Sequence, residues 1–257
     1  MRSCKMPTAG ALNDPRLEDI GAPVEVRRHP GARRLTLRVS RTRRTVIVTL
    51  PSSCDLVEAG SFLHRNIDWV RERLGNLPQP VACGDGVLMP LRGEPHRLRY
   101  VGARRGQSPI VDRRETGAGE AELLISGHAE HAPRRLRDWL FAEAKRDLET
   151  QVAVHARKLG LTHKRISIRD QSSRWGSCST TGALSFSWRL ILAPPTILDY
   201  VAAHEVAHLA EMNHGPRFWK LVETTMPRMD EARRWLRAYG MDLHRYQLDH
   251  RTPPSAH

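Results

Sequence analysis

The feature that most constrains the fold is the segment His204-Glu205-Val206-Ala207-His208, which lies inside a run of apolar residues. The flanking positions 201–203 and 209–210 are also apolar, so a helix over about 196–212 is predicted to be buried nearly all round. Burying two imidazoles and a carboxylate is costly unless something pairs them. They either hold a common ligand or are satisfied by hydrogen bonds within a core helix.

The spacing of the two histidines favours a metal site. Positions four apart on a helix lie on one face, one turn apart, so His204 and His208 can hold a single ion. This is the H-E-x-x-H zinc motif. Glu205 lies beside the first candidate ligand and can reach a water molecule on the metal. Zinc lowers the pKa of its water to about 7 and a carboxylate can take the proton. We therefore predict one zinc ion per chain, hydrolytic chemistry, and Glu205 as the general base.

A catalytic zinc site needs a third protein ligand and one open position. His214 is the preferred candidate, because Asn213 can end one helix and Gly215-Pro216 is typical of the start of another. That reversal would return His214 toward the first two histidines. Glu211 and Glu223 are the competing candidates.

The N-terminal half shows the period-2 alternation of β-strands. Strands are expected over residues 35–39, 46–50, 96–101 and 122–126, all in antiparallel arrangement. The first two flank a polar break at 41–44 and predict a hairpin. Asp55 then opens a segment with helical spacing that ends near Gly75.

The C-terminal half mixes helices and strands. Apolar residues every four positions predict an amphipathic helix from Leu136 to near Gly160. Strands are expected over 166–168 and, most clearly, over 184–192. Thr196 is the expected N-cap of the histidine-bearing helix.

These patterns predict an α+β fold whose strand-rich antiparallel N-terminal part precedes a part built on the H-E-x-x-H helix. The expected divisions are a disordered leader at 1–22, the strand-rich region at 23–132, the metal-binding domain at 133–250 and a disordered tail at 251–257.

The chain is strongly basic, with 41 Lys and Arg against 28 Asp and Glu and a net charge of +13. Eight arginines lie between Arg27 and Arg44. Such a cluster fits an anionic partner such as nucleic acid, or the solvated face of a hairpin. The absence of interleaved aromatic residues favours the second interpretation.

The sequence also indicates where in the cell the protein is located. No stretch approaches 18 uninterrupted apolar residues, and the first twenty residues lack the apolar core of a signal peptide. The cysteines at positions 4, 54, 83 and 178 fit neither a zinc knuckle nor a disulfide framework. We expect a cytoplasmic protein with free thiols and no membrane segment.

Residues 174–219 contain several distinct short motifs at characteristic distances from one another. They are Arg174-Trp175-Gly176-Ser177-Cys178, Trp188-Arg189-Leu190, Pro194-Pro195, Tyr200-Val201, the H-E-x-x-H segment and Asn213-His214-Gly215-Pro216-Arg217-Phe218-Trp219. In these motifs the chain resembles the YgjP-type metallopeptidase domains, a branch close to the SprT-like proteases. The resemblance implies a zincin-like fold and a zinc-dependent peptidase acting on peptides or proteins, with His204, His208 and His214 as ligands and Glu205 as the base. Val206 stands where the family commonly has Leu.

The same residues admit three other interpretations. The metzincin pattern also places its third histidine ten residues after the first, but it needs glycine where Glu211 stands. The main alternative function is a nucleic-acid-associated SprT-like protease or adaptor acting on DNA-bound protein, because the chain is so basic. A non-catalytic zinc scaffold is disfavoured by Glu205, since a structural site has four ligands and needs no base.

The segment Trp175-Gly176-Ser177 supports two interpretations equally. As an exposed strand edge near the metal it would receive an extended peptide by β-augmentation, with Gly176 giving access to the backbone. As a packing element, Trp175 would cover the core and Gly176 would mark a bulge.

The same motifs contain a cysteine and three polar residues whose roles can also be predicted. Cys178 is expected to be a small packing thiol rather than a metal ligand. Tyr200, Arg174 and Arg217 are equal candidates for stabilising the oxyanion of the reaction.

Overall fold

The alternating N-terminal segments form a three-stranded sheet in the computed structural model, which describes residues 20–102, 110–115 and 121–248. Its strands are β1 (Val24–Arg28), β2 (Thr36–Ser40) and β3 (Thr45–Leu50), in the order β1-β3-β2. Strands β2 and β3 are antiparallel, with Leu37 opposite Val48, which confirms the predicted hairpin. Strand β1 runs parallel to β3.

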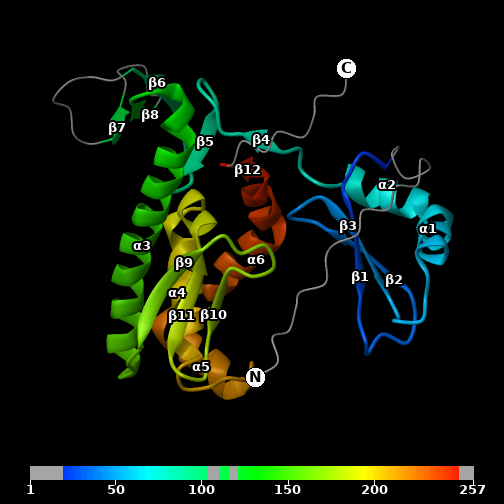
Figure 1. Cartoon of the computed structure of the whole chain (residues 1–257). Coiled ribbons are helices and arrows are strands. Elements are labelled where there is room, and N and C mark those ends of the chain that lie inside the picture. Colours follow the sequence, from blue (N-terminus) through cyan, green and yellow to red (C-terminus); the bar gives the residue numbers. More distant parts are fainter. Residues whose placement is uncertain (1–19, 103–109, 116–120, 249–257) are drawn as a thin grey trace, which may run out of the picture. The chain divides into compact units, whose positions relative to one another are not determined.

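Two short helices, α1 (Leu56–Arg65) and α2 (Ile67–Gly75), follow this sheet (Figure 1). The Asp55 carboxylate caps α1 by accepting a hydrogen bond of 2.6 Å from the Glu58 N–H. The sequence predicted one helical segment here, and the structure interrupts it at Asn66. Val46, Val48, Leu63 and Val70 pack into a common core, and this first compact unit ends at Gln79.

The second unit begins at Pro80 and contains a four-stranded sheet in the order β5-β6-β8-β7. The strands are β5 (Leu88–Leu91), β6 (Glu94–Val101), β7 (Val111–Glu115) and β8 (Ala121–Ser126). Strands β6 and β8 confirm the two predicted here, but they pair in parallel. The all-antiparallel expectation was therefore wrong for β6/β8 and for β1/β3. Period-2 alternation identifies a strand but carries no information on its direction.

The long helix α3 (Ala132–Leu159) confirms the predicted amphipathic helix, and Gly160 ends it in the left-handed conformation at φ 65°. Its buried stripe, which includes Leu136, Leu140 and Leu148, shares a core with β5, β6 and β8 and with the C-terminal elements. The sequence-based boundary at 132/133 consequently falls inside the second compact unit, because the sheet before it and the helix after it bury their apolar faces together.

A second, three-stranded sheet follows α3, in the order β10-β11-β9. Its strands are β9 (Arg165–Arg169), β10 (Gly176–Cys178) and β11 (Ala183–Ser187). The predicted strand over 184–192 was too long, because β11 stops at Ser187 and Trp188–Leu192 form a 3-10 helix, η3. Ser187 begins this turn by accepting a hydrogen bond from the Arg189 N–H. All five residues of η3 are buried, so the apolar spacing reflects burial on every side rather than a strand.

The C-terminal elements are α4 (Pro195–Ala207), α5 (Pro216–Thr225), α6 (Met229–Tyr239), the 3-10 helix η4 (Gly240–Arg245) and β12 (Tyr246–Gln247), which pairs with β4 (Val81–Ala82). Pro194 rather than Thr196 is the N-cap of α4, and α4 ends at Ala207 rather than Met212, with His208 as C-cap. The predicted start of α5 is confirmed, with Gly215 as N-cap and Pro216 in the first turn.

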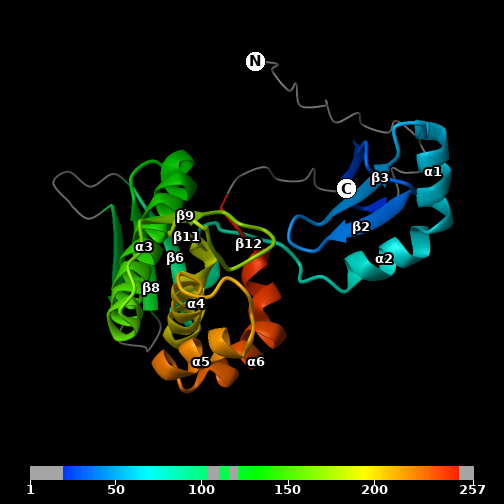
Figure 2. The ribbon, with the colours of Figure 1, turned by 90° about the horizontal axis from the view of Figure 1, so that it is seen from below.

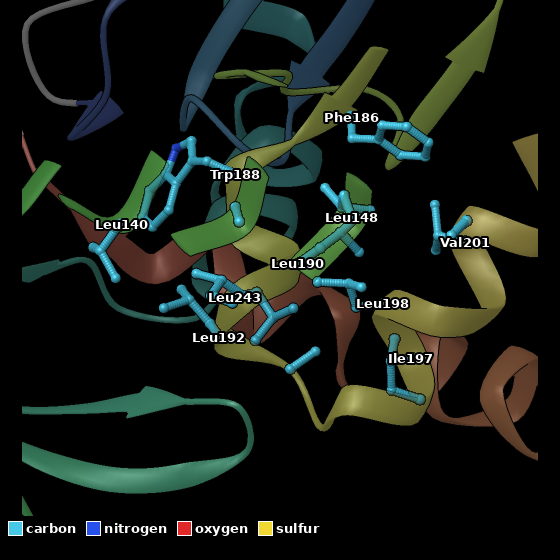
Figure 3. Close-up of a cluster of buried hydrophobic side chains, with 14 of the residues drawn as sticks. Leu140, Leu148, Phe186, Trp188, Leu190, Leu192, Ile197, Leu198, Val201 and Leu243 are labelled. Atoms are coloured by element: carbon cyan, nitrogen blue, oxygen red, sulfur yellow. The ribbon is translucent and has the colours of Figure 1, made fainter. Parts of the chain in front are cut away.

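The core that supports α4 is built from several elements. Figure 3 shows Leu140 and Leu148 of α3 beside Phe186, the η3 side chains and Ile197, Leu198 and Val201 of α4. Figure 2 shows α4 with α5 and α6 around it. Because α4 is held on several sides by apolar contacts, its last turn is a rigid platform for the side chains that it carries.

Most of the predicted leader at 1–22 and all of the predicted tail at 251–257 lie outside the described residues. Among the described residues, Cys54, Cys83 and Cys178 are free thiols. Every helix in the described ranges is too short or too polar to span a bilayer.

Candidate metal centre

Three imidazoles converge where α4 ends and the chain turns toward α5. His204 lies in the last turn of α4, His208 is its C-cap, and His214 lies just before Gly215. One ring nitrogen from each lies within 4.8 Å of the others, and the Nε2 atoms of His204 and His214 are 3.1 Å apart. In the described part of the chain this is the group of His, Cys, Asp and Glu side chains that could hold a metal ion.

The donor set fits a divalent metal such as zinc. Histidine nitrogens bind zinc at about 2.0–2.1 Å, so two of them around a tetrahedral ion lie about 3.3 Å apart, close to the observed separation. The rings must also be neutral to act as ligands. Burial, aided by the neighbouring rings, lowers the pKa of His204 to about 3, and burial also lowers the pKa of His208. Both imidazoles are therefore neutral near pH 7.

Neighbouring groups orient these rings. The Nδ1 atom of His208 is 3.0 Å from the carbonyl oxygen of Glu211, so Nδ1–H donates there and Nε2 keeps its lone pair. The Nδ1 atom of His204 is 3.5 Å from the hydroxyl of Tyr200, one helical turn earlier. Phe218 packs against His208 with ring centroids 4.4 Å apart. Trp219 lies 5.7 Å from the His214 ring, so the start of α5 supports the imidazoles with aromatic contacts.

Glu205 projects from α4 into a buried position beside the histidines and is only 5 % exposed. Burial raises its pKa to about 8, and Arg174 partly offsets this effect. Its Oε2 atom is buried and has no hydrogen-bond partner among the described residues. A nearby dication would favour the charged carboxylate. The orphaned oxygen therefore keeps lone pairs for a further hydrogen-bond partner.

Gly176 makes room for this carboxylate. A Cβ at Gly176 would lie 2.5 Å from both Cγ and Oε1 of Glu205, far inside any normal contact. Strand β10 therefore passes directly over the Glu205 side chain because residue 176 has none of its own. The sequence suggests either backbone access or a bulge at Gly176, and it does not reveal this packing against Glu205.

Strand β10 is also an edge strand of its sheet. The N–H of Ser187 bonds to the carbonyl of Trp175 and the N–H of Ser179 bonds to the carbonyl of Ala183. Hydrogen-bonded pairs alternate along an antiparallel ladder, so Ser177 also bonds to β11, opposite Ser185. The N–H and C=O groups of Gly176 therefore point away from β11. The edge beside Glu205 thus offers N–H and C=O groups for pairing.

The other residues of this segment contribute packing. Trp175 is partly buried in the core, with its ring 5.0 Å from His244 and one ring atom 3.2 Å from where a Cβ on Gly240 would be. Cys178 packs against the same core, donates a weak hydrogen bond to the Ser179 carbonyl and is not in the histidine group.

The competing candidates point elsewhere. The Glu211 carboxylate is 4.0 Å from Arg217, whose side chain is 89 % exposed, while the Glu211 carbonyl orients His208. Glu223 is exposed on α5. Neither carboxylate belongs to the group formed by the three imidazoles.

Comparisons with known proteins identify a family for most of the chain. The family profile described as YgjP-like, metallopeptidase domain, matches residues 33–239. Among solved structures, the crystal structure of the metallopeptidase zymogen of Pyrococcus abyssi abylysin is similar at 22% identity and a TM-score of 0.34, covering 36% of this chain and 95% of that one. A comparison with curated proteins gave no significant match.

Proposed function

Because the chain belongs to the YgjP-like metallopeptidase family, we propose that it is a zinc-dependent peptidase of zincin-like architecture. In this proposal His204, His208 and His214 hold the metal and Glu205 is the general base. The observation that carries it is the meeting of three imidazole nitrogens beside a buried carboxylate with an unpartnered oxygen.

Zinc held by three histidines supplies a Lewis acid with an open position for water and the substrate carbonyl. Glu205 then takes a proton from the attacking water at Oε2 as the water oxygen bonds to the carbonyl carbon. The same carboxyl gives that proton to the leaving amine nitrogen as the C–N bond breaks. Because Glu205 is held between α4 and β10, it keeps one position through both transfers.

The free edge of β10 gives the substrate a place to align. An extended peptide pairing with the backbone of Gly176 adds a strand to the sheet and passes over the histidines and Glu205. Main-chain pairing of this kind recognises peptides as a class and leaves sequence preference to side-chain contacts. In this arrangement Trp175 fixes the edge through its packing on η4, and Ser177 keeps β10 bonded to β11.

The test combines metal analysis with cleavage of a quenched-fluorescence peptide library. The purified protein is expected to contain about one zinc per chain and to cleave members of the library. A chelator should abolish cleavage and added zinc should restore it. Cleavage that persists after complete metal removal would refute the proposal, as would a fully zinc-loaded protein that cleaves nothing in the library or in unfolded protein substrates.

A further inference from the structure

The arginines of the first unit are concentrated in its strand layer. Residues 24–50 contain eight arginines and one acidic residue, Glu25. Residues 51–79, which contain α1 and α2, have three arginines and four acidic residues. The strand layer therefore carries a large positive charge, while the helical layer is close to neutral.

Half of these eight arginines are satisfied within the unit. Arg28 donates to the carbonyls of Ser52 and Cys54, and Arg44 donates to three carbonyls at the end of α2 and just beyond it. Arg27 lies 2.8 Å and Arg43 lies 3.8 Å from the carboxylate of Glu25. These four arginines stabilise the sheet and its attachment to the helices.

The other four are Arg33, Arg34, Arg38 and Arg41, which we call the β2 stripe. All four side chains are exposed, and none has an ion-pair or hydrogen-bond partner among the described residues. Arg38 is at the middle of β2, Arg33 and Arg34 precede the strand, and Arg41 follows it. The order β1-β3-β2 makes β2 an edge strand, so the stripe lies along an open side of the sheet.

The spacing of the stripe suits a linear polyanion. At about 3.4 Å per residue, the eight steps from Arg33 to Arg41 distribute the cations over at most about 27 Å. One nucleic-acid strand advances about 3.4 Å per nucleotide, so this length corresponds to roughly eight phosphates. Arginine binds phosphate oxygens in a bidentate manner, and the exposed hydroxyl of Thr36 between Arg34 and Arg38 adds a neutral donor.

The composition of the stripe argues against a folded protein partner. Protein interfaces are usually centred on buried aromatic or large apolar anchors, and residues 24–50 contain no Phe, Trp or Tyr. The same absence removes the stacking platforms that read or grip unpaired bases. Contacts to the phosphodiester backbone remain, and they need only charge and hydrogen-bond donors.

We propose that the β2 stripe binds the phosphodiester backbone of nucleic acid without reading its sequence. This surface is distinct from the metal centre and does not depend on the peptidase proposal. It holds the chain on nucleic acid, so proteins on the same strand come within reach at raised local concentration.

The test is fluorescence anisotropy of the full chain with a labelled 20-base-pair DNA duplex between 50 and 200 mM salt. Each phosphate contact contributes about 0.9 to the slope of log affinity against log salt. The double variant Arg34→Gln/Arg38→Gln should therefore lower the slope by about 2. Four contacts would weaken binding about 10²-fold over this salt range, and two contacts about tenfold.

The matched control removes two exposed arginines from the helical layer of the same unit, as Arg65→Gln/Arg73→Gln. It changes the net charge equally and should leave the slope unchanged. Circular dichroism and thermal melting would verify that both variants fold as the parent does.

Three results would overturn the proposal. The first is no binding of the duplex at 50 mM salt. The second is an equal loss of duplex affinity in the stripe variant and the control variant. The third is displacement of the duplex by poly-glutamate as effective as displacement by unlabelled DNA at the same charge concentration. The last result would assign the stripe to acidic proteins instead.

Discussion

The contact between Gly176 and Glu205 makes a quantitative prediction. In Gly176→Ala the new methyl carbon would lie 2.5 Å from Cγ and Oε1 of Glu205, about 1 Å closer than normal contact. The neighbours are the buried stem and carboxylate of a side chain that is 5 % exposed, so they have little room to move. Either β10 shifts outward or Glu205 leaves its position.

Both responses have known magnitudes. Overpacking a buried site costs about 1–3 kcal/mol of unfolding free energy. A catalytic group displaced by about 1 Å can lose about 10²-fold in rate. We therefore expect Gly176→Ala to cleave its peptide about 10²-fold more slowly, to unfold more easily and to retain zinc, because no histidine is touched.

The assay measures kcat/KM on a library peptide, zinc content by mass spectrometry and unfolding free energy by denaturant titration. Gly84→Ala is the matched control, since Gly84 lies in the same unit and a Cβ there meets nothing within 4 Å. In the double variant Gly176→Ala/Glu205→Ala the clashing Cγ and carboxylate are absent, so the overlap should be relieved and stability recovered, but not activity. A Gly176→Ala variant that keeps the stability and the cleavage rate of the parent would show that this contact does not hold Glu205 in place.

Three further predictions rest on other parts of the second unit. His214→Ala should lower zinc affinity sharply in a competitive chelator titration, and full zinc occupancy in this variant would remove His214 from the site. Cys178→Ser should keep its zinc and most of its cleavage rate, because the thiol lies outside the histidine group, and loss of zinc would contradict that assignment. Burial, aided by Arg189, lowers the pKa of His244 from 6.5 to about 4, so the unfolded chain binds a proton between these values that the folded chain does not. Stability should therefore be complete above pH 6.5 and fall by about 3 kcal/mol as the pH drops toward 4. In denaturant titrations His244→Phe should lose less stability over that range, and identical pH profiles for variant and parent would rule out this role.

Local signals in the sequence predicted much of the fold. The hairpin over β2 and β3, the cap at Asp55, the end of α3 at Gly160 and the start of α5 at Gly215 depend on neighbouring residues, and the structure confirms each. The same holds for the approach of His214 to His204, because a short reversal between two helices leaves few other arrangements.

Features that depend on distant residues could not be predicted in this way. The parallel pairing of β6 with β8 joins strands that are not consecutive in the chain, since β7 lies between them in sequence. The turn at Trp188 follows from burial on every side, which resembles a strand when only apolar spacing is considered. The contact of Gly176 with Glu205 joins residues far apart in the chain, and a single sequence does not reveal such a pair.

The role of Glu205 as the general base is tested by the cleavage rate of Glu205→Gln, with the zinc content determined on the same sample. Glutamine preserves the size of the side chain but cannot accept and return a proton. We expect a folded variant with about one zinc per chain and a rate lower by about 10²–10⁴-fold, with little change in peptide binding. A zinc-loaded Glu205→Gln that cleaves at the parent rate would contradict the assignment of Glu205 as the base.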